Sequence, residues 1–279
     1  MDEFVFRKPM FGKDVEIVLY DVDDELAEQI ANRSYAEGQR LSRIFSFYDE
    51  RSELSTLNKD RRMHVSDELL KLLGIAREFY TLTDGRYDVS LGKSIMQRKS
   101  GQPETAKCSF EDVIIEGNDV TLKNDDVLID LGSIAKGYIV DKMVEVLEEE
   151  GVLSGLVDGR GDIRIFGDAI QNISIQHPRD KDAIIKSINV TDCGIATSGD
   201  YSQYVGSFDK PHIINSMDFS SITVVGPSLA IADAFATALF VSNSLKLIER
   251  YKDLKIMTID KDMNMKYYNG FEELLEESS

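Results

Sequence analysis

The sequence predicts an α+β protein. Two long stretches, residues 24–45 and 135–150, carry apolar positions at helical spacing. Between residues 155 and 226, short β-like runs follow one another with no long helix between them. Because helices and strands do not alternate in a regular strand–helix–strand order, the pattern favours α+β over a parallel α/β sheet.

The N-terminal half is predicted to hold one strand and two helices. Residues 15–20 read as a strand, and the helix over 24–45 has Leu26, Ile30, Leu41 and Ile44 as possible inward positions. Residues 47–58 predict a loop with a short helical turn. Ser66 is a candidate N-cap for a second helix that continues to Tyr80. The stretch 83–92 is turn-rich, and we expect 97–106 to be the most mobile loop.

The C-terminal half is predicted to begin with strands over 120–124 and 127–132, which flank a turn at 124–126. The helix over 135–150 ends at Gly151. A last helix over 228–251 precedes a β-hairpin and an acidic, solvated helical tail. The β-like runs are 155–159, 162–167, 173–177, 187–192, 221–226, 256–260 and 266–270. The sequence contains no Pro/Ser-rich linker and no repeat, so residues 1–279 are expected to form a single domain.

Composition excludes several classes of protein. The formal charge is −18, from 50 acidic and 32 basic residues, which argues against a nucleic-acid surface. A polyanionic ligand would need a local nest of amides or a metal ion. Cys108 and Cys193 lack metal-ligand spacing and are expected to be free thiols. The N-terminus lacks an apolar h-region and no run approaches a membrane span, so we expect a soluble, cytoplasmic protein.

The segment DLGSIAKG, residues 130–137, joins an apolar run to a helix. Its small residues allow a ligand to approach the backbone, and Lys136 adds a positive charge beside the first helix amides. It matches neither the Walker pattern nor GxGxxG. The residues alone leave two interpretations open: a ligand-contacting loop, or a tight turn with a surface lysine.

Asp233 and Thr237 lie four residues apart in an apolar helical stretch and therefore share one face. A buried carboxylate needs a partner or a metal ion, and a hard cation such as Mg²⁺ suits these oxygens. The alternative is an aspartate at the solvent edge of a core helix.

The remaining motifs are weak when each is taken alone. The segments VDGRGDIRIFG and ATSGDY are compatible with plain turns. His64 is expected on the surface and His177 in a turn. His212 precedes an apolar pair and is either a core histidine or a catalytic group.

Eight segments form a recognisable series when they are taken in order. They are FRKPMFG (6–12), FYDERSELSTLN (47–58), TDGRYDVSLG (83–92), DLGSIAKGYIVD (130–141), VDGRGDIRIFG (157–167), ATSGDY (196–201), HII (212–214) and ADAFATALFV (232–241). This series resembles the ApbE family, the FAD:protein FMN transferases, from about residue 6 to residue 247. Residues 130–141 match the family pattern DLG-x-IAKG-hydrophobic-x-x-D closely.

The resemblance implies an α+β architecture of the T-fold type, with antiparallel sheets and packed helices. It also implies that the protein binds FAD and Mg²⁺, transfers FMN to a Ser or Thr hydroxyl of an acceptor protein, and releases AMP. The metal would be held by the Ser133 carbonyl, Asp233 and Thr237. Lys136 would neutralise charge, and His212 would activate the hydroxyl. The expected FAD-site residues are Met10, Tyr48, Arg86, Tyr87, Asp88, Asp130, Lys136, Gly161, Asp162 and Ile214.

The chain also departs from the family pattern. Arg160 stands where the family has the first glycine of GGD, and the DPxTG continuation after His212 is replaced by Asn215, Ser216 and Met217. Two alternatives therefore remain: an FAD diphosphatase that produces FMN and AMP, and a flavin-binding protein without turnover. Retention of Asp233 and the other site residues weighs against the second.

Overall fold

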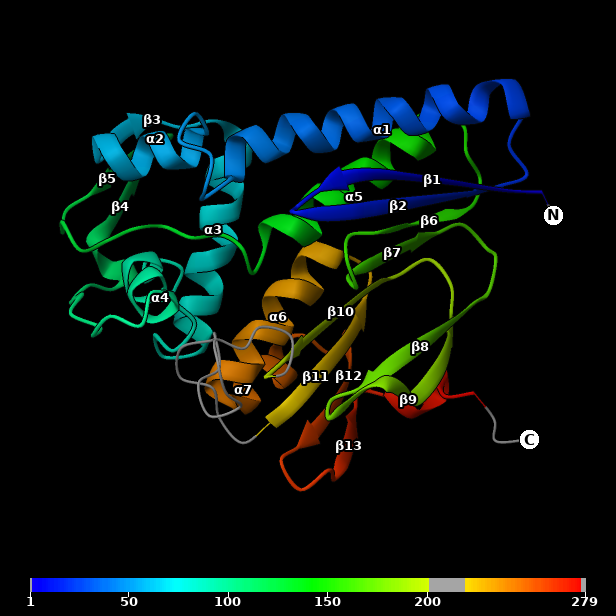
Figure 1. The fold of residues 1–279 in the computed structure, drawn as a ribbon. Helices are drawn as coiled ribbons and strands as arrows, with labels where there is room; N and C mark the ends of the chain where they lie inside the picture. Colours follow the sequence, from blue (N-terminus) through cyan, green and yellow to red (C-terminus); the bar gives the residue numbers. More distant parts are fainter. Residues whose placement is uncertain (1, 201–218, 277–279) are drawn as a thin grey trace.

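The computed structural model describes residues 2–200 and 219–276, and its centre is an eight-stranded antiparallel sheet (Figure 1). The order across the sheet is β1-β2-β6-β7-β10-β11-β12-β13. Its strands are β1 (Glu3–Met10), β2 (Lys13–Tyr20), β6 (Gly155–Asp158), β7 (Ile163–Phe166), β10 (Gly194–Gly199), β11 (Phe219–Gly226), β12 (Lys255–Asp260) and β13 (Met265–Tyr268).

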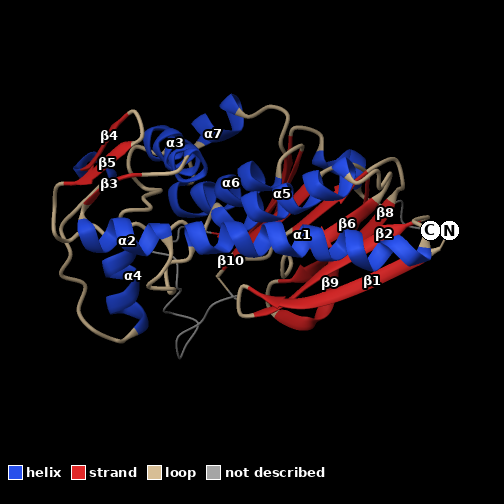
Figure 2. Ribbon diagram, turned by 90° about the horizontal axis from the view of Figure 1, so that it is seen from above, coloured by secondary structure: helices blue, strands red, loops and turns tan. Residues whose placement is uncertain are grey.

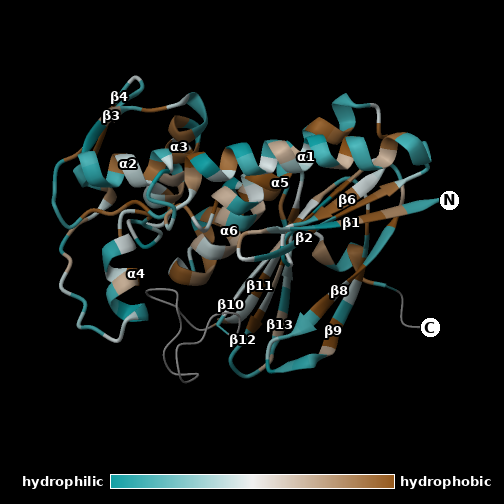
Figure 3. Cartoon of the chain, turned by 45° about the horizontal axis from the view of Figure 1, so that its top comes forward, coloured by the Kyte–Doolittle hydropathy of each residue, from teal (hydrophilic) through white to brown (hydrophobic). Residues whose placement is uncertain are grey.

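Three helices cover one face of this sheet: α1 (Asp24–Phe45), α5 (Ala135–Glu149) and α6 (Leu229–Ser242). Figure 2 shows them lying above the strands, with α1 running along the sheet. Contacts join α1 to α5, α5 to α6, and α6 to β10 and β11. Helix α6 is apolar almost all round (Figure 3), which is typical of a helix enclosed by its neighbours.

The opposite face of the sheet packs against a hairpin of β8 (Gln171–His177) and β9 (Asp180–Val190). A separate apolar cluster fills this interface. It includes Ile175 and Ile188 from the hairpin, and Ile195 and Val225 from the large sheet. The protein therefore has a helical layer, a sheet and a hairpin layer.

A smaller lobe lies at one end of the molecule, on the left of Figure 1. Its elements are α2 (Glu53–Asp60), β3 (Arg62–His64), α3 (Asp67–Leu82), α4 (Gly92–Lys99), β4 (Val113–Glu116) and β5 (Asp119–Leu122). The main apolar core continues into this lobe, where Phe79 of α3 meets Phe235 of α6 edge-on at 6.4 Å between ring centroids. This continuity favours a single domain, which stays a prediction.

Helices α5 and α6 are fastened to each other at their N-terminal ends. A Cβ on Gly137 would lie 2.6 Å from the carbonyl oxygen of Leu229, so only glycine permits this close approach. The Asp141 carboxylate accepts hydrogen bonds from the amides of Leu229 (3.0 Å) and Ala230 (2.9 Å), and from the Ser228 hydroxyl (2.9 Å). An aspartate on α5 thus caps α6.

Most of the predicted elements are confirmed. The helix over 24–45 and the Ser66 N-cap, which accepts from the Leu69 amide, are present, and Gly151 stops α5 with φ +87°. Strands β12 and β13 pair as the expected hairpin. Cys108 and Cys193 are free thiols. Among the described helices, none is both long enough and apolar enough to cross a bilayer.

One predicted strand is wrong. Residues 127–132 form no strand, because their backbone is bound by side chains and loops instead of a neighbouring strand. Asn58 donates to the Ile129 carbonyl (2.9 Å) and accepts from the Ile129 amide (2.7 Å). The Asp130 amide donates to the carbonyl of Val89 (2.8 Å).

Three smaller predictions also need correction. The last helix is divided into α6 and α7 (Leu245–Arg250), since Asn243 adopts a left-handed conformation with φ +51°. The acidic tail begins with a 3-10 turn whose Phe271 is buried, so it is not entirely solvated. Leu26 is half exposed instead of inward.

Candidate active site

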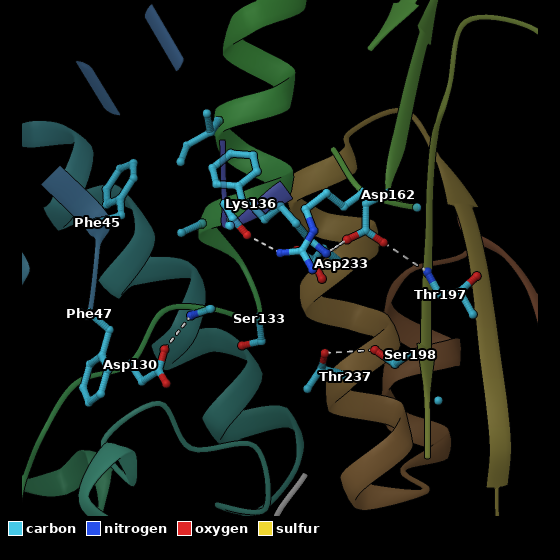
Figure 4. Close-up of a pocket in the computed structure, with 18 of the residues that line it drawn as sticks. Phe45, Phe47, Asp130, Ser133, Lys136, Asp162, Thr197, Ser198, Asp233 and Thr237 are labelled. Carbon is cyan, nitrogen blue, oxygen red and sulfur yellow. Dashed lines mark hydrogen bonds and ion pairs between the residues drawn. The ribbon is translucent and has the colours of Figure 1, made fainter. Parts of the chain in front are cut away.

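A cavity of about 1390 Å³ lies where the helical layer, the smaller lobe and the large sheet meet (Figure 4). The first turn of α5 and one face of α6 line it, together with β10 and the turns that join β1 to β2 and β6 to β7. Ligand sites commonly measure about 300–1,000 Å³, so this cavity has room for a large ligand.

The cavity exists because the sheet opens beside β10. Strand β7 pairs with β10 at Gly194 and Ile195, and within residues 2–200 and 219–276 no other strand pairs with the rest of β10 on that side. Thr197 and Ser198 both line the cavity, although adjacent strand residues point to opposite faces of a sheet. The cavity therefore extends around the open edge of β10 and reaches both faces.

Lys136 and Asp162 form an ion pair in the middle of the cavity (Figure 4). Lys136 lies in the first turn of α5, and Asp162 comes from the β6–β7 turn and also accepts from the Thr197 amide at 3.4 Å. Asp162 is buried, whereas Lys136 is partly exposed. This pair ties the start of α5 to the open edge of β10.

Asp233 is enclosed, with an exposed fraction of 6%, so the solvent-edge alternative is excluded. Its Oδ2 accepts from the Gly137 amide at 3.3 Å. Burial raises its pKa from 3.8 to about 6, while the positive charge of Lys136 acts in the opposite direction. One turn further along α6, the Thr237 hydroxyl lies 3.0 Å from the Ser198 hydroxyl. Carboxylate and hydroxyl oxygens thus share one wall.

The loop between α3 and α4 and the segment that joins β5 to α5 supply the facing wall. The Tyr87 hydroxyl and the Ser133 hydroxyl are hydrogen-bonded at 2.8 Å. Asp130 accepts from the Gly132 amide at 2.9 Å, and burial raises the pKa of its carboxyl. Burial also raises the pKa of the Tyr87 phenol.

Asp88 lines the cavity, but its carboxylate is already engaged in the local turn. One oxygen accepts from the amide and the hydroxyl of Ser90, and the other accepts from the Phe110 amide. Burial raises the pKa of its carboxyl in spite of these bonds. Its interactions in the structure are therefore those of a turn-organising residue.

The other expected site residues have varied positions. Arg86 and Gly161 line the cavity, as does Tyr48, which is 69% exposed and accepts from Lys99 at 2.6 Å. Met10, which was expected in the FAD site, does not line the cavity. Only 6% of Met10 is exposed, and its side chain extends toward Gly38 in the core. Its neighbours Phe11 and Gly12 reach the cavity instead. His212 and Ile214 lie outside the described residues.

Sequence reasoning did not assign several lining residues. Thr197 and Ser198 lie in ATSGDY, which reads as a plain turn but forms part of β10. The available signal was the pair of hydroxylated residues flanked by the small residues Ala196 and Gly199. Lys99 and Phe47 had no such signal, because only the packing of the smaller lobe brings them to the cavity.

The fold and the site together define an α+β protein with a large cavity built around a lysine–aspartate pair and a wall of oxygen donors. The ApbE family model matches residues 11–258, and the chain belongs to the ApbE family. The predicted α+β class, with antiparallel sheets and packed helices, is confirmed.

Known relatives carry the family's activity in their names. The chain is 28% identical to the FAD:protein FMN transferase of Haemophilus influenzae in an alignment of 241 positions that covers 73% of this chain and 70% of that protein. It is also 28% identical to the Vibrio cholerae protein of the same name, in an alignment of 257 positions that covers 80% of this chain and 77% of that protein. The chain is thus a homologue of transferases.

Solved structures share the fold. The ApbE protein of Thermotoga maritima superposes with a TM-score of 0.88 at 24% identity, covering 99% of this chain and 100% of that chain. The flavin transferase ApbE of Vibrio cholerae gives a TM-score of 0.82 at 25% identity, covering 98% and 99%.

Proposed function

We propose that this protein is a Mg²⁺-dependent FAD:protein FMN transferase, which moves FMN from FAD to a Ser or Thr hydroxyl of an acceptor protein. The observation that carries the proposal is the placement of Asp233, Thr237 and Lys136 in one large cavity. The family and the names of the relatives supply the reaction.

The lining of the cavity suits a ligand with two ring systems joined by an anionic middle. Aromatic side chains, including Phe45 and Phe47, lie where α1 ends and the chain enters the smaller lobe, and isoleucines such as Ile173 and Ile195 lie at the hairpin and the sheet. The Lys136–Asp162 pair lies at the start of α5, where helix amides favour negative charge. FAD has this construction, with a diphosphate between its flavin and its adenosine.

The oxygen donors fit a magnesium ion. Asp233 offers a buried carboxylate and Thr237 a hydroxyl, and the resemblance adds the Ser133 carbonyl. Magnesium is usually held by one or two carboxylates, with waters and substrate phosphates completing its shell. In the described part of the chain, no three His, Cys, Asp or Glu side chains are grouped for a metal, so a zinc-type set is not offered. When bound, the ion would polarise a phosphoryl oxygen.

The chain's own residues would then orient the reactants. Lys136, held by Asp162, balances negative charge as the phosphorus–oxygen bond to AMP breaks. A new phosphorus–oxygen bond forms to the acceptor hydroxyl, whose proton must leave. We assign that proton to His212 by the resemblance alone. Tyr48, Arg86, Tyr87, Asp88, Asp130 and Gly161 are proposed to contact FAD.

The test combines the protein with FAD, Mg²⁺ and a candidate acceptor bearing a Ser or Thr attachment site. AMP release and a fluorescent acceptor band in a denaturing gel are measured together. AMP with a fluorescent band supports the transferase, and AMP with free FMN and no band favours the diphosphatase. FAD binding without AMP, across a range of acceptors, contradicts both activities.

A pair of variants examines the metal assignment. Asp233→Ala should abolish AMP release, because it removes the carboxylate from the cavity wall that Asp233 and Thr237 form. Asp119→Ala changes an exposed aspartate of β5 outside the cavity and should keep normal release. Unchanged AMP release in Asp233→Ala would show that the metal assignment is wrong.

A further inference from the structure

The turn between β6 and β7 presents a strained arginine to the cavity. Arg160 has φ +73° and the next residue, Gly161, has φ +94°. In this region the Cβ of an L-residue crowds the following carbonyl, so arginine is disfavoured where glycine is not. The turn is nevertheless well fixed: Asp158 accepts from the Gly161 amide (2.6 Å), and the Gly159 amide donates to the Asp162 carbonyl (2.8 Å).

The Arg160 side chain reaches a second strained turn. Its Nη1 donates to the carbonyl of Phe11, in the β1–β2 turn, and Phe11 itself has φ +53°. Both residues line the cavity. Non-glycine residues persist in such conformations where their surroundings fix them, and they cluster at ligand sites. The bond joins two hairpin turns into one wall of the cavity.

The charge balance of the cavity gives this arginine a role. Lys136 is the cation at the start of α5, but the carboxylate of Asp162 already faces it. An anionic ligand therefore benefits from a further cation close to this pair. Arg160 is two residues from Asp162 on the same turn, and it is exposed on the cavity wall.

We infer that Arg160 binds a phosphate group of the nucleotide ligand, an inference that rests on the proposed use of FAD. A guanidinium carries five N–H donors in a fixed fork, and the Phe11 carbonyl takes one of them. Such a fork matches phosphate oxygens in two-point contacts, which an ammonium does not reproduce. The backbone strain at Arg160 is thus maintained for ligand binding.

The experiment measures the dissociation constants of FAD and of riboflavin, which lacks phosphate, by flavin fluorescence. Asparagine tolerates left-handed φ, so Arg160→Asn removes the cation without adding strain, and Arg160→Lys keeps the charge but loses the fork. Arg7→Asn is the matched control, because Arg7 pairs with Glu16 on β1 and does not line the cavity.

Arg160→Asn should weaken FAD binding roughly 10- to 100-fold, the worth of a charge-assisted hydrogen bond. It should leave riboflavin binding unchanged and the melting temperature equal or higher. Arg160→Lys should be intermediate and Arg7→Asn normal. Unchanged FAD binding, or an equal loss for both ligands, would overturn the inference.

If riboflavin does not bind the wild-type protein measurably, ADP takes its place, and its dissociation constant is measured by competition with FAD. An equal loss of ADP and FAD affinity in Arg160→Asn supports the phosphate contact, and unaltered ADP affinity overturns it. A wild-type protein that binds neither FAD nor ADP contradicts the proposed function itself, and is thereby distinguished from failure of the Arg160 contact.

Discussion

Replacing Asp233 with asparagine should make the metal-free protein more stable while removing its activity. The Asp233 carboxyl is buried in α6, and burial raises its pKa from 3.8 to about 6. The charged form is therefore disfavoured in the folded state. Asparagine has nearly the same shape, and its carbonyl oxygen can still accept from the Gly137 amide.

The magnitude and the sign follow from linkage between folding and protonation. Raising the pKa of Asp233 from 3.8 to about 6 lowers the free energy of unfolding above pH 7 by about 3 kcal/mol, relative to the protein with Asp233 protonated. At pH values between the pKa of Asp233 in the unfolded chain and its pKa in the folded protein, the folded state binds more protons than the unfolded state. The stability of the wild type therefore falls as the pH rises from about 4 to about 6. At pH 5, roughly half of the loss is present.

The assay is urea unfolding in EDTA at pH 5 and pH 8. Asp233→Asn should exceed the wild type by about 3 kcal/mol at pH 8 and by about half of that at pH 5. A variant that is destabilised equally at both pH values would refute the reasoning, because the Asp233 carboxyl group would then stabilise the folded state in both of its protonation states.

Added Mg²⁺ supplies a second readout. An ion that binds the folded state raises its stability, so the wild type should gain stability with Mg²⁺ at pH 8 and Asp233→Asn should not. Asp130→Asn is the matched control. It removes a partly buried carboxyl whose pKa is likewise raised by burial, but it lies outside the proposed metal ligands and should keep the Mg²⁺ response.

Three further substitutions test the framework around the site. Gly137→Ala places a methyl group 2.6 Å from a carbonyl oxygen of α6 and should cost about 1–3 kcal/mol in urea unfolding. Asp141→Ala removes the cap of α6 and should cost about 1–2 kcal/mol, seen as a lower melting temperature; an unchanged value would mean that water replaces the cap. Asn58→Ala leaves the Ile129 backbone without its partners and should cost about 2–4 kcal/mol; a loss below about 1 kcal/mol would contradict the role assigned to Asn58.

Elements whose signals are local were predicted well from the sequence. The helix over 24–45 has apolar spacing within its own residues and an N-cap, Asp23, immediately before them, and the helix that Ser66 caps is specified in the same local way. The segment 127–132 was mistaken for a strand because its apolar run is genuine, but its backbone partner is a side chain 71 residues away. No local pattern carries that information.

The residues of the candidate site also fall into those that a local sequence signal predicts and those that only the tertiary fold brings together. Asp233 and Thr237 could be paired from helix geometry alone, and both line the cavity. Ser198 could not be joined to Thr237, since that contact depends on how β10 packs against α6. The prediction that Met10 lines the site is wrong by one position. The turn residues Phe11 and Gly12 reach the cavity, and the end of strand β1 does not.

The mutual fastening of α5 and α6 also governs how the site moves. The amide of Gly137 donates to Asp233, and the amides at the start of α6 donate to Asp141, so each helix supplies a carboxylate to the other. Local opening is easiest where few buried contacts are lost, and this helix pair lies inside the main core. Hydrogen exchange at the Gly137 amide should therefore require near-global unfolding. The wall that carries Asp233 and Thr237 would then act as a fixed template, and any motion that admits a ligand would have to come from the surrounding turns.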